Sequence, residues 1–221
     1  MKNHIVKVLQ TDFVTHNVKR FVVEKPDGYT FVSGQATDVA IHKPGLENEL
    51  RPFTFTCLPD SDHLEFIIKI YTGHEGMTEK LLQVNAGDKL IVHDVFGTIH
   101  FEGAGLFIAA GAGITPFIAI FRHLKEQNKL SGNTLLFANR TEDDIILKDE
   151  LKQMLGGNYF DVIEVPKSGG AGKRIDRELL KQHLSLGKQF YYVCGPEKFT
   201  ATMVEMLMEL GVAKSQIIIE Q

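Results

Sequence analysis

The pattern of secondary-structure signals changes near residue 103, and this change limits the possible folds more than any other feature of the sequence. Before it, six short β-rich runs are separated by turn signals, with no helical crossover between them. After it, strand-like and helix-like segments alternate. The sequence therefore predicts two domains, residues 1–102 and 103–221, which join at the short glycine-containing stretch 102–105.

The N-terminal half predicts a small antiparallel β-barrel, because six strands without crossover helices close through Greek-key connections. A segment with helical character, residues 74–82, precedes the last strand. The expected strands are Ile5–Gln10, Val18–Glu24, Asp38–His42, Arg51–Cys57, His63–Tyr71 and Lys89–Asp94.

The C-terminal half predicts a Rossmann-like α/β domain, because regular strand–helix alternation gives a parallel sheet, here five-stranded, with helices on both faces. The expected strands are Leu106–Ala110, Thr134–Asn139, Phe160–Val165, Phe190–Cys194 and Gln216–Glu220. The expected helices are Thr115–Asn128, Lys148–Leu155, Arg177–Leu186 and Glu197–Leu210.

Charge and composition exclude several classes of function. The net charge of −4 argues against a nucleic-acid-binding surface, although a local cluster of basic groups can still bind a small anion. The two cysteines and nine histidines show no metal-ligand spacing, so we expect no metal site, and the cysteine usage fits a reducing compartment. The sequence has no signal-peptide pattern and no run near the roughly 18 apolar residues of a membrane span. We therefore expect a cytoplasmic protein that binds neither nucleic acid nor membrane.

The predicted strand that begins at Arg51 carries groups that suit a planar, phosphorylated ligand. The Arg51 guanidinium can fork onto phosphate oxygens, the Phe53 ring can pack on a flat surface, and the Thr54 hydroxyl can bond a ring nitrogen. Pro52 sits between them and stiffens the backbone. The alternative is an ordinary barrel strand with an exposed arginine and core phenylalanines.

A second motif, Gly76-Met77-Thr78, opens the helical segment of the barrel half. Backbone N–H groups at a helix start and the Thr78 hydroxyl suit a phosphate. A capped turn without a ligand would look the same. If both motifs act together, Arg51 and this helix clamp one pyrophosphate while Phe53 and Thr54 face a ring system.

The turn Gly111-Ala112-Gly113-Ile114-Thr115-Pro116 follows a predicted strand and opens a helix. Gly111 and Gly113 allow a tight turn and close approach of a pyrophosphate. We expect Thr115 to be the N-cap and Pro116 the first helical residue, so that free N–H groups face the ligand. Many strand–helix turns of this kind hold no nucleotide.

Two further segments lie at the carboxyl edge of the predicted parallel sheet, where open α/β sheets bind ligands. Cys194-Gly195-Pro196 begins another helix and would place a small side chain beside a bound ring, although a buried structural cysteine is the simpler alternative. Asn139 and Arg140 follow the second strand, where an adenosine ribose would be read.

Together, in this order, these segments resemble the motifs of the ferredoxin–NADP reductase superfamily of flavoproteins, which includes flavodoxin reductases and the reductase modules of oxygenases. The resemblance covers nearly the whole chain. It implies FAD on the barrel and NAD(P)H on the α/β domain. It also implies hydride transfer from nicotinamide C4 to flavin N5 where the halves meet.

The resemblance also implies roles for single residues. Arg51 and Thr78, with Gly76 and Met77, would bind the flavin pyrophosphate. Phe53 would pack on the isoalloxazine and Thr54 would lie near N5. The remaining roles implied are further flavin contacts from Lys69 and Tyr71, a place beside the nicotinamide for Cys194, and a nearby carboxylate from Glu220.

The chain departs from the family pattern at two places that affect function. Phe53 stands where relatives carry tyrosine, so one hydroxyl is missing and flavin binding should be weaker by roughly 1 kcal/mol. There is no cysteine-rich segment for an iron–sulfur cluster. The electron acceptor is therefore expected to be a separate molecule, such as flavodoxin or ferredoxin, and the enzyme is expected to be a monomer.

Three functions follow from these patterns. The first is an NAD(P)H-dependent flavoenzyme that reduces a separate carrier. The second is a flavin reductase that uses flavin as a substrate, and the third is a non-catalytic electron-transfer or nucleotide-binding subunit. The coenzyme stays open, because Arg140, Lys173 and Arg174 suit a 2′-phosphate whereas the carboxylates at 142–144 disfavour it.

Overall fold

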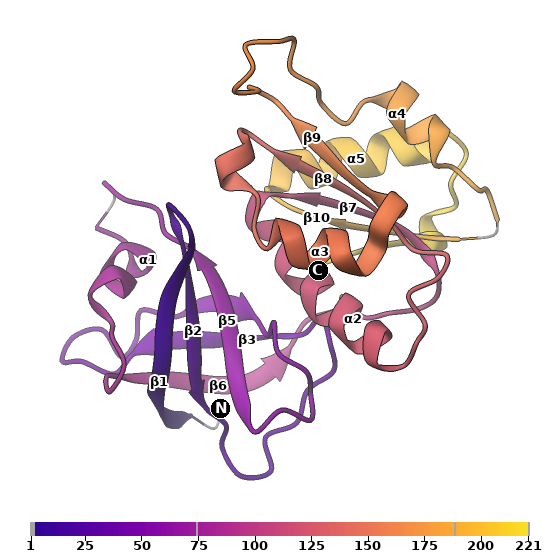
Figure 1. Ribbon diagram of the computed structural model, residues 1–221. Helices are drawn as coiled ribbons and strands as arrows, with labels where there is room; N and C mark the ends of the chain where they lie inside the picture. The colour runs from indigo at the N-terminus through magenta and orange to yellow at the C-terminus, as the bar shows by residue number, and fades with distance from the viewer. Residues whose placement is uncertain (1–2, 74, 188, 221) are drawn as a thin grey trace.

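The computed structural model describes residues 3–220, except 74 and 188, and contains two sheets that belong to two domains (Figure 1). The chain passes from the first sheet to the second between residues 96 and 105. An antiparallel barrel and a parallel α/β layer structure result, so the predicted fold class is confirmed.

Six antiparallel strands form the barrel, in the spatial order β4-β3-β6-β1-β2-β5. The two outer strands approach each other through a bridge between Phe55 and Phe66, and the Thr56 N–H donates to the Glu65 carbonyl over 2.9 Å. These bonds close the sheet and remove its free edges. The strands are β1 (His4–Thr15), β2 (Val18–Glu24), β3 (Ala36–Ile41), β4 (Arg51–Thr54), β5 (His63–Lys69) and β6 (Lys89–Phe96).

Strand β1 is longer than predicted because it serves two partners. Its first residues pair with β6 and the rest pair with β2 after an irregularity near Val8. Its polar second half hid the strand in the sequence, since Asp12 points outward and pairs with Arg20. Strand β4 is shorter than predicted, because beyond Thr54 the chain turns to bridge β5 and Phe55 enters the barrel core.

The helical segment of the barrel half is a single short turn followed by a 3₁₀ turn. Helix α1 (Met77–Lys80) leads directly into η1 (Leu81–Gln83), and Gly76 is the N-cap. Met77 and Leu81 are buried in the barrel core, which anchors the segment. Figure 1 shows α1 on the side of the barrel remote from the α/β domain. The predicted start of this segment, His74, lies outside the described residues.

Five parallel strands form the second sheet, in the order β11-β10-β7-β8-β9. Its strands are β7 (Gly105–Ala110), β8 (Thr134–Asn139), β9 (Tyr159–Ile163), β10 (Phe190–Cys194) and β11 (Ile217–Ile219). Its helices are α2 (Thr115–Glu126), α3 (Lys148–Leu155), α4 (Arg177–Gln182) and α5 (Glu197–Glu209). The 3₁₀ turns are η2 (Gly111–Ile114), η3 (Glu142–Asp144), η4 (Gly156–Asn158) and η5 (Lys214–Gln216).

The two faces of this sheet bury separate apolar clusters, because successive strand side chains point to opposite sides. Phe107 and Phe137 pack with α2 and α3, whereas Ile108 and Leu136 pack with α4 and α5. The first cluster continues into the barrel through Val18, Ile67 and Ile99. The face that carries α2 is therefore the one that meets the barrel (Figure 1).

Candidate functional site

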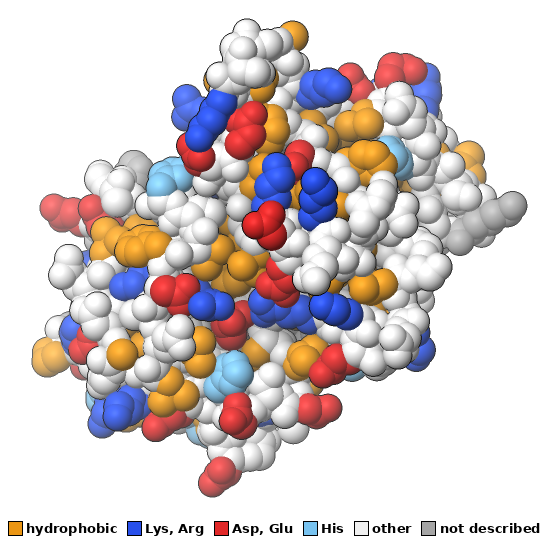
Figure 2. Space-filling view, viewed as in Figure 1, with side chains coloured by type: hydrophobic (Ala, Val, Ile, Leu, Met, Phe, Trp, Pro, Cys, Tyr) orange, Lys and Arg blue, Asp and Glu red, His pale blue; other side chains and the backbone are white. Residues whose placement is uncertain are grey.

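A cavity of about 800 Å³ opens at the carboxyl edge of the parallel sheet and is lined from both domains. The α/β domain contributes the loops after β7, β8 and β10 together with the first turns of α5. The barrel contributes Lys69 and Tyr71, which the sequence analysis assigned to the flavin side. Near the centre of the face in Figure 2, charged side chains of both signs surround apolar side chains where the two domains adjoin.

The two helix-opening turns of the α/β domain touch each other. A Cβ atom on Gly113 would lie 2.6 Å from the Gly195 nitrogen and closer still to the Cys194 carbonyl. Gly111 adopts a positive φ of 52°, which suits glycine. Since β7 and β10 are neighbouring strands, these glycines bring the turn at 111–114 and the Cys194–Pro196 turn to one rim of the cavity.

The expected capping of α2 is wrong in detail. Ile114 is the N-cap, Thr115 is the first helical residue and Pro116 is the second. The Thr115 hydroxyl donates to the Ala112 carbonyl over 3.0 Å and does not accept an N–H bond. The reason is η2, a 3₁₀ turn that begins the helical path four residues earlier than expected. At α5 the expectation is confirmed, because Pro196 is the N-cap and Glu197 lies in the first turn.

Cys194 and Glu220, both predicted to act at the reaction centre, lie close together. Burial, with the nearby Glu220 carboxylate adding to it, raises the pKa of the Cys194 thiol to about 12. Partial burial also raises the pKa of Glu220, although hydrogen bonds from the N–H groups of Thr98 and Ile99 act in the opposite direction. The Thr98 N–H lies 3.3 Å from Glu220 Oε1. Cys194 is therefore a neutral thiol, not a nucleophile, at ordinary pH.

Thr54 lies on the barrel side of the same region. It pairs with Ala36 across β3–β4, and Ala36 in turn borders the loop at Gly97 that contacts the Glu220 carboxylate. Only one strand therefore separates Thr54 from that carboxylate. The structure thus brings the three residues predicted to be catalytic to one border between the domains.

Asn139, at the end of β8, brings a buried amide without partners to the cavity lining. The residue is only 6% exposed, it lines the cavity, and its side-chain oxygen and nitrogen have no hydrogen-bond partner among the described residues. A buried amide without partners costs about 1–3 kcal/mol, so such a group indicates a missing ligand or water. A bound ribose hydroxyl could satisfy both of its atoms.

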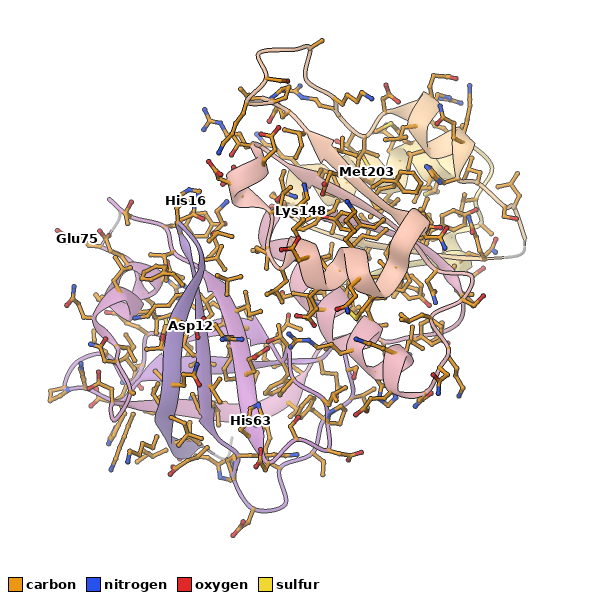
Figure 3. All side chains as sticks on the ribbon, in the orientation of Figure 1. Asp12, His16, His63, Glu75, Lys148 and Met203 are labelled. Carbon is orange, nitrogen blue, oxygen red and sulfur yellow. The ribbon has the colours of Figure 1, made fainter. Side chains whose placement is uncertain are left out.

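The acidic residues that follow Arg140 each have a partner, and Asp144 also lines the cavity. The Lys167 backbone N–H donates to the Glu142 carboxylate over 3.2 Å, and the Lys167 ammonium lies 2.6 Å from Asp143. Asp144 accepts from Thr141 in a capping box. Figure 3 shows His16 at the barrel turn that faces this segment, and its ring lies 3.8 Å from Asp144. Arg140 lines the cavity, and its guanidinium has no partner within the part of the chain that is described.

One wall of the cavity was not predicted from the sequence. It consists of one face of α5, on which Phe199, Met203 and Met206 recur at helical spacing beside Lys198. Figure 3 marks Met203 within the α/β domain. The spacing of these apolar residues was visible in the sequence, but it is equally typical of a helix that only covers a sheet.

On the barrel, the segment that leads into Arg51 is bonded to α1 through Glu49. The Lys80 ammonium donates to both oxygens of Glu49 over 2.7 and 2.8 Å, which ties the segment before β4 to this helix. Arg51 is exposed, and its guanidinium donates to the Leu50 carbonyl over 2.7 Å. The Glu79 carboxylate accepts from the loop amide of Glu75 and so fixes the approach to Gly76. That Arg51 and the start of α1 bind one pyrophosphate stays a prediction.

The seat expected for the flavin ring is partly open. Phe53 and Thr54 are half-buried, and Phe53 packs against the barrel core. Pro52 and Tyr71 are exposed, whereas Met77 is buried. These residues fit a flat ligand that lies across β4. Within residues 3–220, leaving out 74 and 188, no cluster of acidic, histidine or cysteine side chains has the arrangement of a metal site. No helix in the same residues is both long and apolar enough to cross a bilayer.

Comparison with known proteins agrees with this geometry. The oxidoreductase NAD-binding domain family matches residues 107–205. NADH-cytochrome b5 reductase 2 of Aspergillus oryzae is 31% identical, over 96% of this chain and 76% of that protein. The reductase component of propane 2-monooxygenase from Rhodococcus jostii is 30% identical, over 90% of this chain and 57% of its own length. The chain spans about half of several relatives, for example 46% of bovine cytochrome b5 reductase 4.

Solved structures show the same two-domain arrangement. The CS-b5R domains of human Ncb5or in the NAD+ form superpose with a TM-score of 0.84 at 27% identity, covering 99% of this chain and 69% of that one. A ferredoxin NADP+ reductase from Neisseria gonorrhoeae, at 18% identity, shares the fold with a TM-score of 0.85, over 99% of this chain and 98% of that one. The chain therefore belongs to the ferredoxin–NADP reductase-like superfamily of FAD- and NAD(P)-binding oxidoreductases.

Proposed function

We propose that this chain is an FAD-dependent oxidoreductase that takes hydride from NAD(P)H and passes electrons to a separate carrier such as flavodoxin or ferredoxin. The observation that carries the proposal is the cavity at the sheet edge, which two glycine turns, an unpartnered buried amide and two barrel residues line together. Membership of the superfamily supports the same chemistry.

When bound, FAD would supply the redox chemistry, which is acceptance of a hydride (two electrons and a proton) from NAD(P)H and release of the electrons to the carrier. The role of the protein is to bind, orient and exclude water. Arg51 and the N–H groups at the start of α1 would hold the flavin pyrophosphate. Phe53 would pack on the ring, and the Thr54 hydroxyl would donate to N5.

On the coenzyme side, the turn at 111–114 would hold the pyrophosphate and Asn139 would bond the adenosine ribose. The Arg140 guanidinium has no partner among the described residues, and Glu142 and Asp143 are bonded to Lys167, which supports acceptance of a 2′-phosphate and hence of NADPH. Cys194 would present a small, neutral thiol beside the nicotinamide. Glu220, whose pKa is raised, would hold a proton near this centre to a higher pH than an exposed carboxyl.

Two other kinds of electron acceptor are also supported, each by one observation. The half-open seat at Phe53 supports a flavin reductase, in which flavin is a loosely held substrate. Relatives named cytochrome b5 reductase and propane 2-monooxygenase reductase component support a cytochrome or an oxygenase component as the carrier. A non-catalytic subunit is the third alternative, and activity measurements distinguish it from the others.

Anaerobic titration of the purified chain with NADH and with NADPH tests the proposal. We expect FAD to bind and its absorbance near 450 nm to bleach with at least one coenzyme. A protein that cannot bind FAD contradicts the proposal. Release of flavin during gel filtration, with activity restored by free flavin, would identify a flavin reductase. Absence of ferricyanide reduction by the FAD-loaded chain would indicate a non-catalytic subunit.

A further inference from the structure

Arg122 bonds the α/β domain to the barrel. It lies on α2, and its Nη1 atom donates to the Thr56 carbonyl over 2.8 Å and to Glu65 Oε1 over 2.7 Å. Both acceptors belong to the barrel. The rest of the guanidinium is held within its own domain, because Nε and Nη2 donate to the two oxygens of Glu150 on α3 over 2.6 and 2.9 Å.

The acceptor on the barrel is itself fixed. The Thr56 hydroxyl donates to Glu65 Oε1 over 2.7 Å, and Arg20 Nη1 lies 4.0 Å from the other oxygen. Arg20 in turn makes a two-pronged pair with Asp12, which Figure 3 marks on the barrel. Charges of alternating sign therefore run from β1 across the domain border to α3.

This network is shielded from water. The Glu65 side chain is 9% exposed and that of Arg122 is 20% exposed. Burial alone would lower the pKa of Arg122, but the carboxylates of Glu150 and Glu65 outweigh it and raise that pKa. A buried ion pair is weak support for overall stability, because desolvation offsets much of the attraction. It does favour one geometry strongly, since any other relative position leaves a buried charge unpaired.

The two residues that bond across the domain border, Arg122 and Thr56, each lie a short distance along the chain from one of the two ligand motifs. Arg122 is seven residues along α2 from Thr115, or about 10 Å at the α-helical rise. Thr56 is two residues beyond Thr54, or about 7 Å along an extended chain. A movement of Arg122 relative to Thr56 would therefore be transmitted to the gap between the coenzyme turn and the flavin strand.

We propose that Arg122 is a positioning residue, which locks α2 onto the strand that follows Thr54 and thereby sets the distance over which hydride moves. This inference rests on the proposed function for its kinetic consequence. The lock itself, as a property of the two domains, does not depend on any ligand.

The test compares Arg122→Met with Arg177→Met, which removes an exposed ion pair to Glu209 that lies wholly within the α/β domain. Stopped-flow reduction at saturating coenzyme should slow about ten- to a hundred-fold in Arg122→Met, because displacements of about 1 Å cost rates of this order. Dissociation constants for FAD and coenzyme should change less than about three-fold, because each ligand has its main contacts within one domain. The control should behave as the wild type.

Hydrogen–deuterium exchange of the ligand-free proteins gives a readout that does not depend on activity. Peptides over 51–66 and 115–126 should exchange faster in Arg122→Met than in Arg177→Met, while peptides over strand β8, residues 134–139, stay unchanged. Glu65→Gln keeps the acceptor atom and should retain most of the wild-type rate. If Arg122→Met does not fold, Arg122→Lys replaces it, with a smaller loss expected in the same direction.

Unchanged reduction and unchanged exchange in the Arg122 variant would overturn the inference. So would a loss of rate that follows entirely from weaker FAD or coenzyme binding. If wild-type protein is not reduced by either coenzyme, the proposed function fails, and the exchange measurement alone then decides whether Arg122 locks the domains.

Discussion

At the scale of single residues, the residue type at position 113 is restricted to glycine by its contact with the turn after β10. The two turns approach so closely that a methyl group at Gly113 would overlap the backbone at Cys194 and Gly195. This explains why the coenzyme turn carries its second glycine, although the φ of this residue is not positive. From the sequence, Gly113 was expected to let a phosphate approach the backbone closely. The structure adds a second reason for glycine, which is the close contact between the two turns.

Gly113→Ala should therefore destabilise the protein by about 1–3 kcal/mol, the usual cost of overpacking a rigid site. Urea unfolding measures this change. Gly157→Ala is the matched control, because its added methyl group meets no atom within 4 Å and its φ is not positive. Equal stability of the two variants would mean that the two turns separate easily.

Phe53→Tyr tests the missing hydroxyl in the flavin seat. If the seat is one hydrogen bond short, tyrosine should tighten FAD binding by about 1 kcal/mol, or roughly five-fold in Kd. Quenching of flavin fluorescence on titration of the apoprotein measures the affinity. Phe160→Tyr, on the exposed side of β9, provides a control for the added hydroxyl. Weaker binding by Phe53→Tyr would indicate that the ring contacts the flavin in another way.

Some residues of the site follow from sequence and others do not. Motif residues such as Gly111 and Asn139 were predicted because each follows a strand directly, and parallel strands end at one edge. Arg122 was not predicted, because helical spacing gives an arginine on α2 no special status and its partners are 57 and 66 positions away in the chain. Long-range pairing of this kind leaves no local pattern in a sequence.

At the scale of elements, strand and helix types were predicted well and their ends were not. Strand β2 and strand β8 have the predicted bounds, since apolar alternation and turn residues mark both ends. Strand β1 extends further, because its polar half is stabilised by pairing with β2. Helix α4 ends at Gln182, earlier than expected, where the Gln189 side chain donates to the His183 carbonyl. Tertiary contacts fix these ends.

Helix α1 is too short to be stable alone, and Lys19 on β2 supports it. The buried Lys19 ammonium donates to the carbonyls of Leu81, Leu82 and Val84, with the shortest bond 2.7 Å long. It thereby satisfies the carbonyl groups at the end of the α1–η1 segment and complements the negative end of its dipole. Lys19 therefore holds the C-terminal end of this segment, while the predicted pyrophosphate site is at its N-terminal end.

Lys19→Met should loosen this segment and weaken FAD binding several-fold, since two buried carbonyls and a partly buried one lose a donor. Isothermal titration with FAD measures the affinity, and thermal unfolding reports stability. Lys181→Met, which removes an exposed pair on α4, is the control. The affinity for the coenzyme should stay constant in both variants. An unchanged FAD affinity in folded Lys19→Met would show that α1 needs no support from β2.

At the scale of the whole molecule, the cavity is mostly basic although the protein as a whole is acidic. The chain carries a net charge of −4. The cavity nevertheless has five basic side chains and two carboxylates, and one of these carboxylates, Glu164, is paired with Arg174. The basic residues are Lys69, Arg140, Lys173, Arg174 and Lys198. An anionic dinucleotide is therefore attracted to the cavity, while other anions meet a protein surface of like sign.

This distribution predicts that coenzyme affinity falls as salt rises. Between 0.1 and 1 M NaCl the screening length shrinks from about 10 Å to about 3 Å, so partly exposed cations lose most of their attraction. The Kd for NADP+ should rise several-fold, and more than the Kd for NAD+, because the 2′-phosphate adds charge beside Arg140. The double variant Lys173→Gln/Lys198→Gln should flatten this dependence. Lys152→Gln/Lys214→Gln, which removes two exposed charges outside the cavity lining, should leave it unchanged. Equal slopes for both double variants would mean that the net charge of the protein, and not the cavity, determines the attraction.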